Sequence, residues 1–147
     1  MYEGKFFNNL FDGEGTLKFK DGSVYIGNFL CGKKNGNGKF YVDDLLIYDG
    51  EWKNDFKHGK GKMYYPHGSS YEGNWFYDAY NGQGDFIFPN HSRYKGEWVK
   101  DKRDGLGTFT DVNGETYTGE WKNNMKHGEC TFQDTDGSKL ICGFFEN

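Results

Sequence analysis

The chain has only four histidines and three cysteines that could bind zinc, and three of these seven residues lie near its C-terminal end. His127 and Cys130 are three residues apart, and Cys142 follows in the next predicted strand. Histidine and cysteine are preferred zinc ligands, and a second chain could complete a tetrahedral site. The alternative is that these three residues are structural. We predict no bound metal and no cofactor, and the zinc site stands beside that prediction as a hypothesis.

Glycine-rich motifs suggest a second chemistry, the binding of phosphate groups. The segment His58-Gly-Lys-Gly-Lys62 lacks the Ser or Thr and the following helix that a P-loop requires. The βαβ pattern of a dinucleotide site is also missing. No serine lies in a Gly-x-Ser-x-Gly motif. We therefore predict a protein without enzymatic activity.

The composition favours a β-rich fold. The 147 residues include 14 Phe, 11 Tyr and 23 Gly, and Ala79 is the single alanine. Glycine costs about 1 kcal/mol relative to alanine in a helix, so helices are unfavourable here. We find neither an apolar run of about 18 residues nor a secretory signal. The odd number of cysteines favours a reducing compartment over a disulfide framework. The net charge of −4 disfavours nucleic-acid binding. These features predict an intracellular β protein.

A repeat of 23 residues runs through the sequence as one array over residues 2–147. Each copy begins with a tyrosine, called position 0, and has Gly at position 2 and Phe or Trp at position 4. A Gly-x-Gly pair follows at positions 11 and 13, and Cys130 replaces its second glycine in the sixth copy. A partial seventh copy begins one residue late, at Ile141. The six complete copies start at Tyr2, Tyr25, Tyr48, Tyr71, Tyr94 and Tyr117.

The spacing within a copy predicts a β-hairpin. In Tyr48-Asp-Gly-Glu-Trp52, aromatic and glycine positions alternate with charged ones, as in a strand with one aromatic face. The segment after the Gly-x-Gly pair alternates in the same way. Hairpins joined end to end form an elongated single-layer antiparallel β-meander in which each hairpin pairs with its neighbours.

The turns between these strands have their own pattern. Asn, Asp or His precedes position 11 and position 20 in every copy, and Asn-Gly and Asp-Gly favour tight turns. We predict a two-residue turn at position 20 and a longer, looser connection after position 4, as in residues 53–58. His58, His67 and His127 occupy such turn positions, and His91 takes the place of the glycine at position 20, which predicts structural roles for all four.

The complete pattern resembles the MORN repeat (membrane occupation and recognition nexus) over essentially the whole chain. The pattern is Tyr-x-Gly-x-Trp, six residues, Gly-x-Gly, six residues, Gly. The resemblance implies a curved single-layer β-meander with a groove along its aromatic face, and a scaffold rather than an enzyme. It also implies a place in the cytoplasm, the cytoskeleton or the cilium and its axoneme. Some members form dimers through their terminal repeats, which implies a homodimer as one partner state.

The aromatic face is the predicted binding surface. A single-layer sheet cannot bury both faces, so we expect ring area to stay accessible, and exposed apolar surface usually marks an interaction site. The expected partner is a helix or extended peptide of another protein. Unpaired edge strands are a second adhesive surface. The predicted partner-binding groove consists of Tyr48, Trp52, Tyr71, Trp75, Tyr94 and Trp98.

The alternative function is that of an adaptor apposed to a membrane. The connections after position 4 are rich in Lys and Arg and would stack along one edge of the sheet. Such an edge could bind anionic phospholipids, at about 1 kcal/mol for each charge near the surface. Asp55, Asp78 and Asp101 share this edge and oppose the idea. The candidate lipid-binding residues are Lys33, Lys34, Lys57, Lys102, Arg103 and Lys126.

Overall fold

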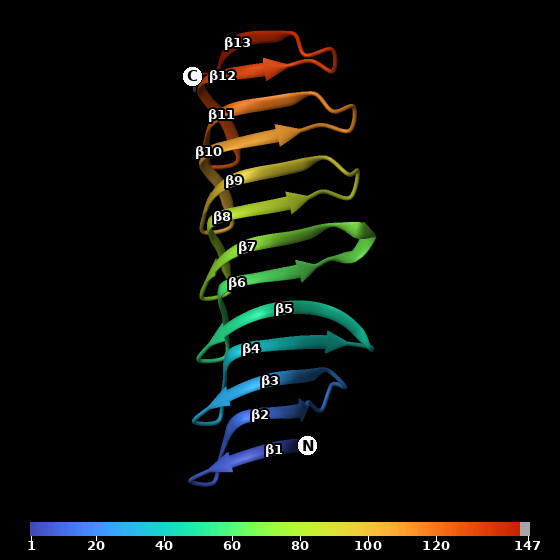
Figure 1. The fold of residues 1–147 in the computed structure, drawn as a ribbon, viewed down its shortest axis with the longest axis vertical. Helices are drawn as coiled ribbons and strands as arrows, with labels where there is room; N and C mark the ends of the chain where they lie inside the picture. The colour runs from blue at the N-terminus through green and yellow to red at the C-terminus, as the bar shows by residue number, and fades with distance from the viewer. Residues whose placement is uncertain (145–147) are drawn as a thin grey trace. The chain divides into compact units, whose positions relative to one another are not determined.

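The computed structural model describes residues 1–144, which form thirteen β-strands and one short 3₁₀ turn, η1 (Pro66–Gly68) (Figure 1). The strands follow one another in chain order as one open antiparallel sheet, which confirms the predicted all-β meander. The strands are β1 (Tyr2–Phe7), β2 (Leu10–Lys18), β3 (Val24–Leu30), β4 (Lys33–Val42), β5 (Leu45–Lys53), β6 (Phe56–Tyr64), β7 (Ser70–Phe76), β8 (Ala79–Ile87), β9 (Arg93–Val99), β10 (Lys102–Thr110), β11 (Thr116–Lys122), β12 (Met125–Gln133) and β13 (Lys139–Phe144).

The chain divides into two compact units. Unit 1 contains Met1–Tyr65 and Asn74–Ala79, and unit 2 contains Pro66–Gly73 and the chain from Tyr80 onward. Strands β1–β6 lie in unit 1 and strands β9–β13 in unit 2, while β7 and β8 have residues in both.

The tight hairpin turn follows position 4, where the sequence predicted a looser connection. Both turn residues, at positions 6 and 7, have positive φ, which defines a type I′ turn. Near position 20, where the tight turn was predicted, Asp43-Asp44 forms one, but residues 19–23 form a wider loop closed by the Phe19 N–H and the Ser23 oxygen. The prediction was wrong because Asn and Asp adopt positive φ without a following glycine. The turn pairs are Asn8-Asn9, Cys31-Gly32, Asn54-Asp55 and Tyr77-Asp78 in unit 1, and Lys100-Asp101 and Asn123-Asn124 in unit 2.

The glycine at position 11 lies in a β-bulge. Between the paired residues Gly27–Gly38 and Phe29–Lys34, β4 holds three residues and β3 only one. Gly36 in this bulge has a φ of 96°, which a residue with a side chain rarely adopts. Bulges strengthen the local twist of a strand, so this glycine bends each repeat at the same point.

The glycines at positions 2 and 13 pair with one another across the strands and form a row within each unit, here called the glycine row. Such a row leaves bare backbone, against which a ring can lie. In unit 1 the row runs through Gly4, Gly15, Gly27, Gly38, Gly50 and Gly61. In unit 2 it runs through Gly84, Gly96, Gly107 and Gly119, and it continues into Cys130 and Cys142.

The last strand keeps the 23-residue period. β13 pairs with β12 through Cys130–Cys142 and Phe132–Leu140, so Leu140 stands at position 0 and Cys142 at position 2. A shift of one residue moves every side chain of a strand to the opposite face. The partial copy that the sequence suggested from Ile141 therefore starts structurally at Leu140. Phe145, which was assigned to that copy, lies outside the described residues.

Candidate functional site

The buried tyrosines lie across the glycine row, and the hydroxyl groups of Tyr25, Tyr48 and Tyr94 are held by hydrogen bonds. A Cβ atom on Gly38 would overlap the ring and hydroxyl of Tyr25. The Tyr25 hydroxyl donates a hydrogen bond of 2.8 Å to the carbonyl oxygen of Asn28. Burial raises the pKa of Tyr25, and it raises the pKa of Tyr94 to about 12. The matching hydroxyl bonds run from Tyr2 to Lys5 and Tyr48 to Glu51 in unit 1, and from Tyr94 to Glu97 in unit 2.

The tryptophan at position 4 joins successive repeats. Trp52 Nε1 donates a hydrogen bond of 3.1 Å to the carbonyl oxygen of Gly38. The Trp52 ring meets Tyr25 and Tyr48 edge to face, with ring centroids 5.4 Å and 5.0 Å apart. Phe29 occupies the same position in the second repeat and carries no indole donor. The other indole bonds run from Trp75 to Gly61 in unit 1, and from Trp98 to Gly84 and Trp121 to Gly107 in unit 2.

The six residues predicted to form a partner-binding groove are core residues. Of the tryptophans, Trp52 and Trp75 in unit 1 are 6% and 4% exposed, and Trp98 in unit 2 is 5% exposed. The expectation that ring area stays accessible is therefore wrong for the isolated chain. The reason is that other side chains of the same face cover the rings. The three tyrosines of the predicted groove are 0% exposed: Tyr48 in unit 1, and Tyr71 and Tyr94 in unit 2.

The covering side chains come from position 9 and are here called the ring-covering residues. Lys34 Nζ lies 4.5 Å from the centroid of the Trp52 ring, and Arg103 Cζ lies 4.7 Å from that of Trp121. Cations in this position are attracted to the ring face. The Trp52 and Trp121 rings are thus each covered by a long cationic side chain. The ring-covering residues are Phe11, Lys34 and Lys57 in unit 1, and Tyr80, Arg103 and Lys126 in unit 2.

Four of the six residues predicted for lipid binding belong to this group. Neighbours in a strand project to opposite faces, so Lys33 is exposed whereas Lys34 is half-buried over the rings. Lys102 and Arg103 are divided in the same way. Burial lowers the pKa of both Lys34 and Arg103. In neither unit, therefore, do the predicted basic residues share one outward edge.

In both units, a side chain at position 7 accepts a hydrogen bond from the backbone N–H of the ring-covering residue in the preceding repeat. In unit 1, Asp55 Oδ1 accepts the Lys34 N–H at 2.8 Å, and Asp78 lies 3.8 Å from Lys57 Nζ. In unit 2, Asn124 Oδ1 accepts the Arg103 N–H at 2.9 Å. The hydrogen bond is kept at Arg103, but the carboxylate charge is replaced by a neutral amide.

An exposed aromatic cluster that the sequence analysis missed lies at the hairpin turn of residues 76–79. Its members, Phe56, Phe76 and Tyr77, are 44%, 55% and 42% exposed. The Tyr77 ring centroid lies 5.6 Å from that of Phe56 and 4.7 Å from that of Phe76. Tyr77 has a φ of 44°, which is unusual for a bulky residue. The sequence feature that could have revealed this cluster is the Tyr at position 6, where the other complete repeats have Asn, Cys or Lys.

Three histidines have structural roles: His58 accepts a hydrogen bond, and His67 and His91 lie in turns. His58 Nδ1 accepts the Tyr77 N–H at 3.4 Å, a role that Asn35 fills for the Asn54 N–H. His67 and His91 have positive φ in turns. These observations explain why His replaces Asn, Asp or Gly at those positions.

The zinc hypothesis is wrong for this structure, because Cys130 and Cys142 are joined in a disulfide. The disulfide also departs from the sequence-based expectation of a reducing compartment over a disulfide framework. Cys31 is free and exposed. His127 Nδ1 is buried and has no hydrogen-bond partner among the described residues. Within residues 1–144, no group of three or more His, Cys, Asp and Glu side chains is arranged to hold a metal ion.

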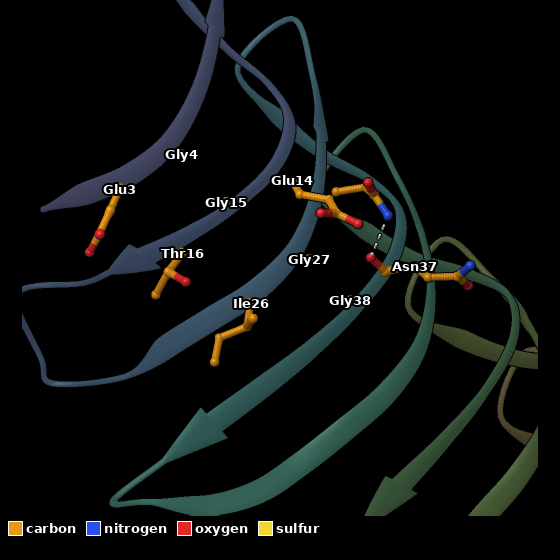
Figure 2. Close-up of a pocket in the computed structure, with 10 residues that line it drawn as sticks. Glu3, Gly4, Glu14, Gly15, Thr16, Ile26, Gly27, Asn37 and Gly38 are labelled. Carbon is orange, nitrogen blue, oxygen red and sulfur yellow. Dashed lines mark hydrogen bonds between the residues drawn. The ribbon is translucent and has the colours of Figure 1, made fainter.

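Unit 1 has a shallow hollow of about 460 Å³ on the face opposite the rings (Figure 2). Glu3, Thr16 and Ile26 come from three successive strands and point to the same side (Figure 2). Asn28 donates a hydrogen bond of 3.3 Å to the Asn37 carbonyl oxygen at its rim. The hollow is open, and its lining combines glycine backbone and Ile26 with the carboxylates of Glu3 and Glu14.

Comparisons with known proteins agree with this geometry. The family model described as MORN repeat matches residues 2–24, 25–44, 48–70, 71–93, 94–116 and 117–139. Comparison with curated proteins found no match. Among solved structures, the chain is similar to the TCP domain of SAS-4 (dCPAP) of Drosophila melanogaster, solved in complex with a proline-rich motif of Ana2 (dSTIL). The TM-score is 0.57 at 13% identity, over 90% of this chain and 72% of that chain, which is a likeness of fold.

No helix in the described part of the chain is long and apolar enough to cross a membrane. The six matched segments fall on the six hairpins that begin at the tyrosines of position 0 and cover most of the chain. This chain belongs to the MORN-repeat family.

Proposed function

We propose that this protein is a non-enzymatic scaffold that binds a protein partner as a structural component of a cytoskeletal or ciliary (axonemal) assembly. Membership of the MORN-repeat family supports a protein- or membrane-binding scaffold. The structurally similar TCP domain of SAS-4 is bound to a proline-rich motif of another protein, which supports a peptide as the partner.

The exposed aromatic cluster of Phe56, Phe76 and Tyr77 is the observation that carries the proposal. Exposed aromatic groups are favoured in protein interfaces, where Tyr and Trp are frequent hot spots. Tyr77 also adopts a conformation that costs about 1–3 kcal/mol for an ordinary residue. A strained, exposed ring that adds little to the core fits a surface kept for binding.

The predicted groove remains part of this proposal, but the residues that would contact the partner there are different. Its rings are buried, so a partner lying over them would contact the ring-covering residues. In unit 1 these are Lys34 and Lys57, above Trp52 and Trp75. The partner would then contact long cationic side chains on an aromatic base.

The alternative, an adaptor that binds anionic phospholipid, depends on Lys33 and Lys102, which are exposed. The other candidates lie over rings, which leaves few outward charges for a membrane in either unit. A homodimer through the terminal strands is a further proposal, since an edge strand offers unpaired backbone groups to a second copy.

The test is a pull-down of the tagged full-length chain from its native source, with and without detergent, read by mass spectrometry. Tyr77→Asn removes the exposed ring and introduces the residue that three other repeats carry at this turn position. The matched control is Lys100→Asn, which introduces the same residue at the same turn position in unit 2. We expect discrete protein partners in both extracts, and we expect Tyr77→Asn to lose them while Lys100→Asn keeps them.

Two results would contradict the proposal. Recovery that requires intact membrane and brings no stoichiometric protein would favour the lipid adaptor. Equal recovery by both variants would exclude the aromatic cluster as the binding surface.

A further inference from the structure

A pocket of about 430 Å³ lies on the aromatic face of unit 2, between the fifth and sixth repeats. It combines two cationic side chains with three apolar ones. Met125 at its rim is 53% exposed. The lining residues are Arg103, Phe109, Trp121, Asn124, Met125 and Lys126, and the cavity is here called the Arg103 pocket.

Arg103 is held firmly in this pocket. Its Nη2 donates a hydrogen bond of 2.9 Å to the Asn124 carbonyl oxygen, and its guanidinium lies over the Trp121 ring. The backbone N–H of Arg103 is bound to Asn124 Oδ1 as well. A cation held at both its backbone and its side chain loses little freedom when an anion binds.

Arg103 has no neighbouring carboxylate at position 7, whereas the equivalent lysines of unit 1 each have an Asp there. Lys57 lies 3.8 Å from the carboxylate of Asp78, and Asp55 holds the backbone of Lys34. Arg103 has neutral Asn124 in that place and makes no ion pair with a carboxylate of the described residues. Lys126 adds a second positive charge. Burial lowers the pKa of Lys126, and the like charge of Arg103 lowers this pKa further.

We propose that the Arg103 pocket binds an acidic side chain of a partner peptide, with the carboxylate at Arg103 and a neighbouring apolar side chain against Phe109 and Met125. Guanidinium groups bind carboxylates through paired, charge-assisted hydrogen bonds. The apolar lining favours a peptide over a lipid headgroup, because the apolar acyl chains of a phospholipid stay within the bilayer while a peptide can place an apolar side chain against Met125. The proposal rests on the proposed function and specifies the partner's chemistry.

The test follows the side-chain N–H signals of Arg103 and Trp121 in NMR spectra of the ¹⁵N-labelled full-length chain. The probe is a short capped peptide of alternating Glu and Leu, and the reference peptide has Gln in place of Glu. Arg93, the only other arginine, is ion-paired with Asp85 and is the internal control. We expect the acidic peptide to shift the Arg103 and Trp121 signals, with no shift at Arg93 and none from the reference peptide.

The informative variant is Asn124→Asp, which introduces the carboxylate that position 7 carries at Asp55, Asp78 and Asp101. It keeps an oxygen acceptor for the Arg103 N–H, so the fold is retained. We expect Asn124→Asp to weaken peptide binding at least about tenfold, because the new carboxylate occupies the guanidinium. Asn123→Asp makes the same charge change outside the pocket lining and should alter the affinity less than about twofold.

Three outcomes would overturn the proposal. These are no shift with the acidic peptide, equal affinity of the Asn124→Asp and Asn123→Asp variants, and shifts produced by phosphatidylserine-containing vesicles but not by the peptide. A pull-down that recovers the same partner with wild type and Asn124→Asp would refute the pocket and leave the scaffold function standing. Peptide binding that depends on Asn124, with no partner recovered from cells, would refute the scaffold function and leave the pocket.

Discussion

The ring of Tyr25 lies against the backbone of Gly38, and its hydroxyl donates to the Asn28 carbonyl oxygen. A side chain at residue 38 would occupy the space of the ring, so tyrosine and glycine depend on each other. The same arrangement recurs in both units, for example between Tyr94 and Gly107. It explains how a single-layer sheet buries large rings without a second layer. The Tyr25 ring lies between the Gly38 backbone and Lys34, and the Tyr94 ring lies between the Gly107 backbone and Arg103.

Gly38→Ala is expected to lower the free energy of unfolding by about 1–3 kcal/mol, the usual cost of inserting a methyl group into filled space. The added methyl would overlap Tyr25. Urea unfolding followed by tryptophan fluorescence measures the change. Lys39→Ala, at an exposed neighbour with a surface ion pair to Asp49, should change stability by less than about 0.5 kcal/mol. Equal effects of the two variants would show that the close contact is unimportant.

Trp98→Phe is expected to destabilise the chain by about 1–2 kcal/mol, because it removes the hydrogen bond to the Gly84 carbonyl oxygen and part of a buried ring. Phe29→Trp should have the opposite sign, with a gain of about 0.5–1.5 kcal/mol, since an indole at residue 29 could donate to the Gly15 carbonyl oxygen as the other tryptophans do in their repeats. Thermal unfolding of both variants tests the pair. Destabilisation by Phe29→Trp would mean that the second repeat has no room for an indole.

Alkaline pH is expected to unfold the protein through its buried tyrosines. The pKa of Tyr94 is raised from 10.0 to about 12, chiefly by burial, so the folded state favours the neutral phenol. The contribution of the neutral Tyr94 phenol to the free energy of unfolding is complete below pH 10. It is lost as the pH rises from about 10 to about 12, at a cost of roughly 2–3 kcal/mol for this residue. Urea unfolding across this range, with tyrosinate absorbance recorded in parallel, gives both quantities. Tyr94→Phe should flatten the pH dependence, and titration of every tyrosine near pH 10 in the folded protein would contradict it.

Reduction of the Cys130–Cys142 disulfide is expected to lower the free energy of unfolding by about 2–3 kcal/mol. The two residues are 12 apart in sequence, and closing a loop of this length restricts the unfolded chain by an amount of this order. Thermal unfolding with and without a dithiol reductant measures the loss, and alkylation with mass spectrometry confirms the thiol count. Cys31→Ser removes the free, exposed thiol and should leave the transition unchanged. An unchanged transition on reduction would refute the prediction.

Much of the fold could be predicted from local pattern. Alternation with a period of two in Tyr48-Asp-Gly-Glu-Trp52 places the aromatic residues on one face of a strand, because successive side chains of a strand point to opposite sides. The 23-residue period repeats that strand, and antiparallel pairing of neighbours follows from short connections. The turn was misplaced because positive φ at Asn54 and Asp55 needs no glycine, a preference that an Asn-Gly rule does not capture.

The sequence by itself determined the strands, their aromatic face and the family, since these depend on residue type and spacing within one repeat. Only the tertiary structure decided which surfaces remain open. Lys34 covers the Trp52 ring and Asn124 replaces a carboxylate beside Arg103, and the members of each pair lie 18 and 21 residues apart in neighbouring repeats. The exposure of a ring and the balance of a charge depend on what the neighbouring repeat places against them. Such contacts are set by the register between strands, which spacing within one repeat does not specify.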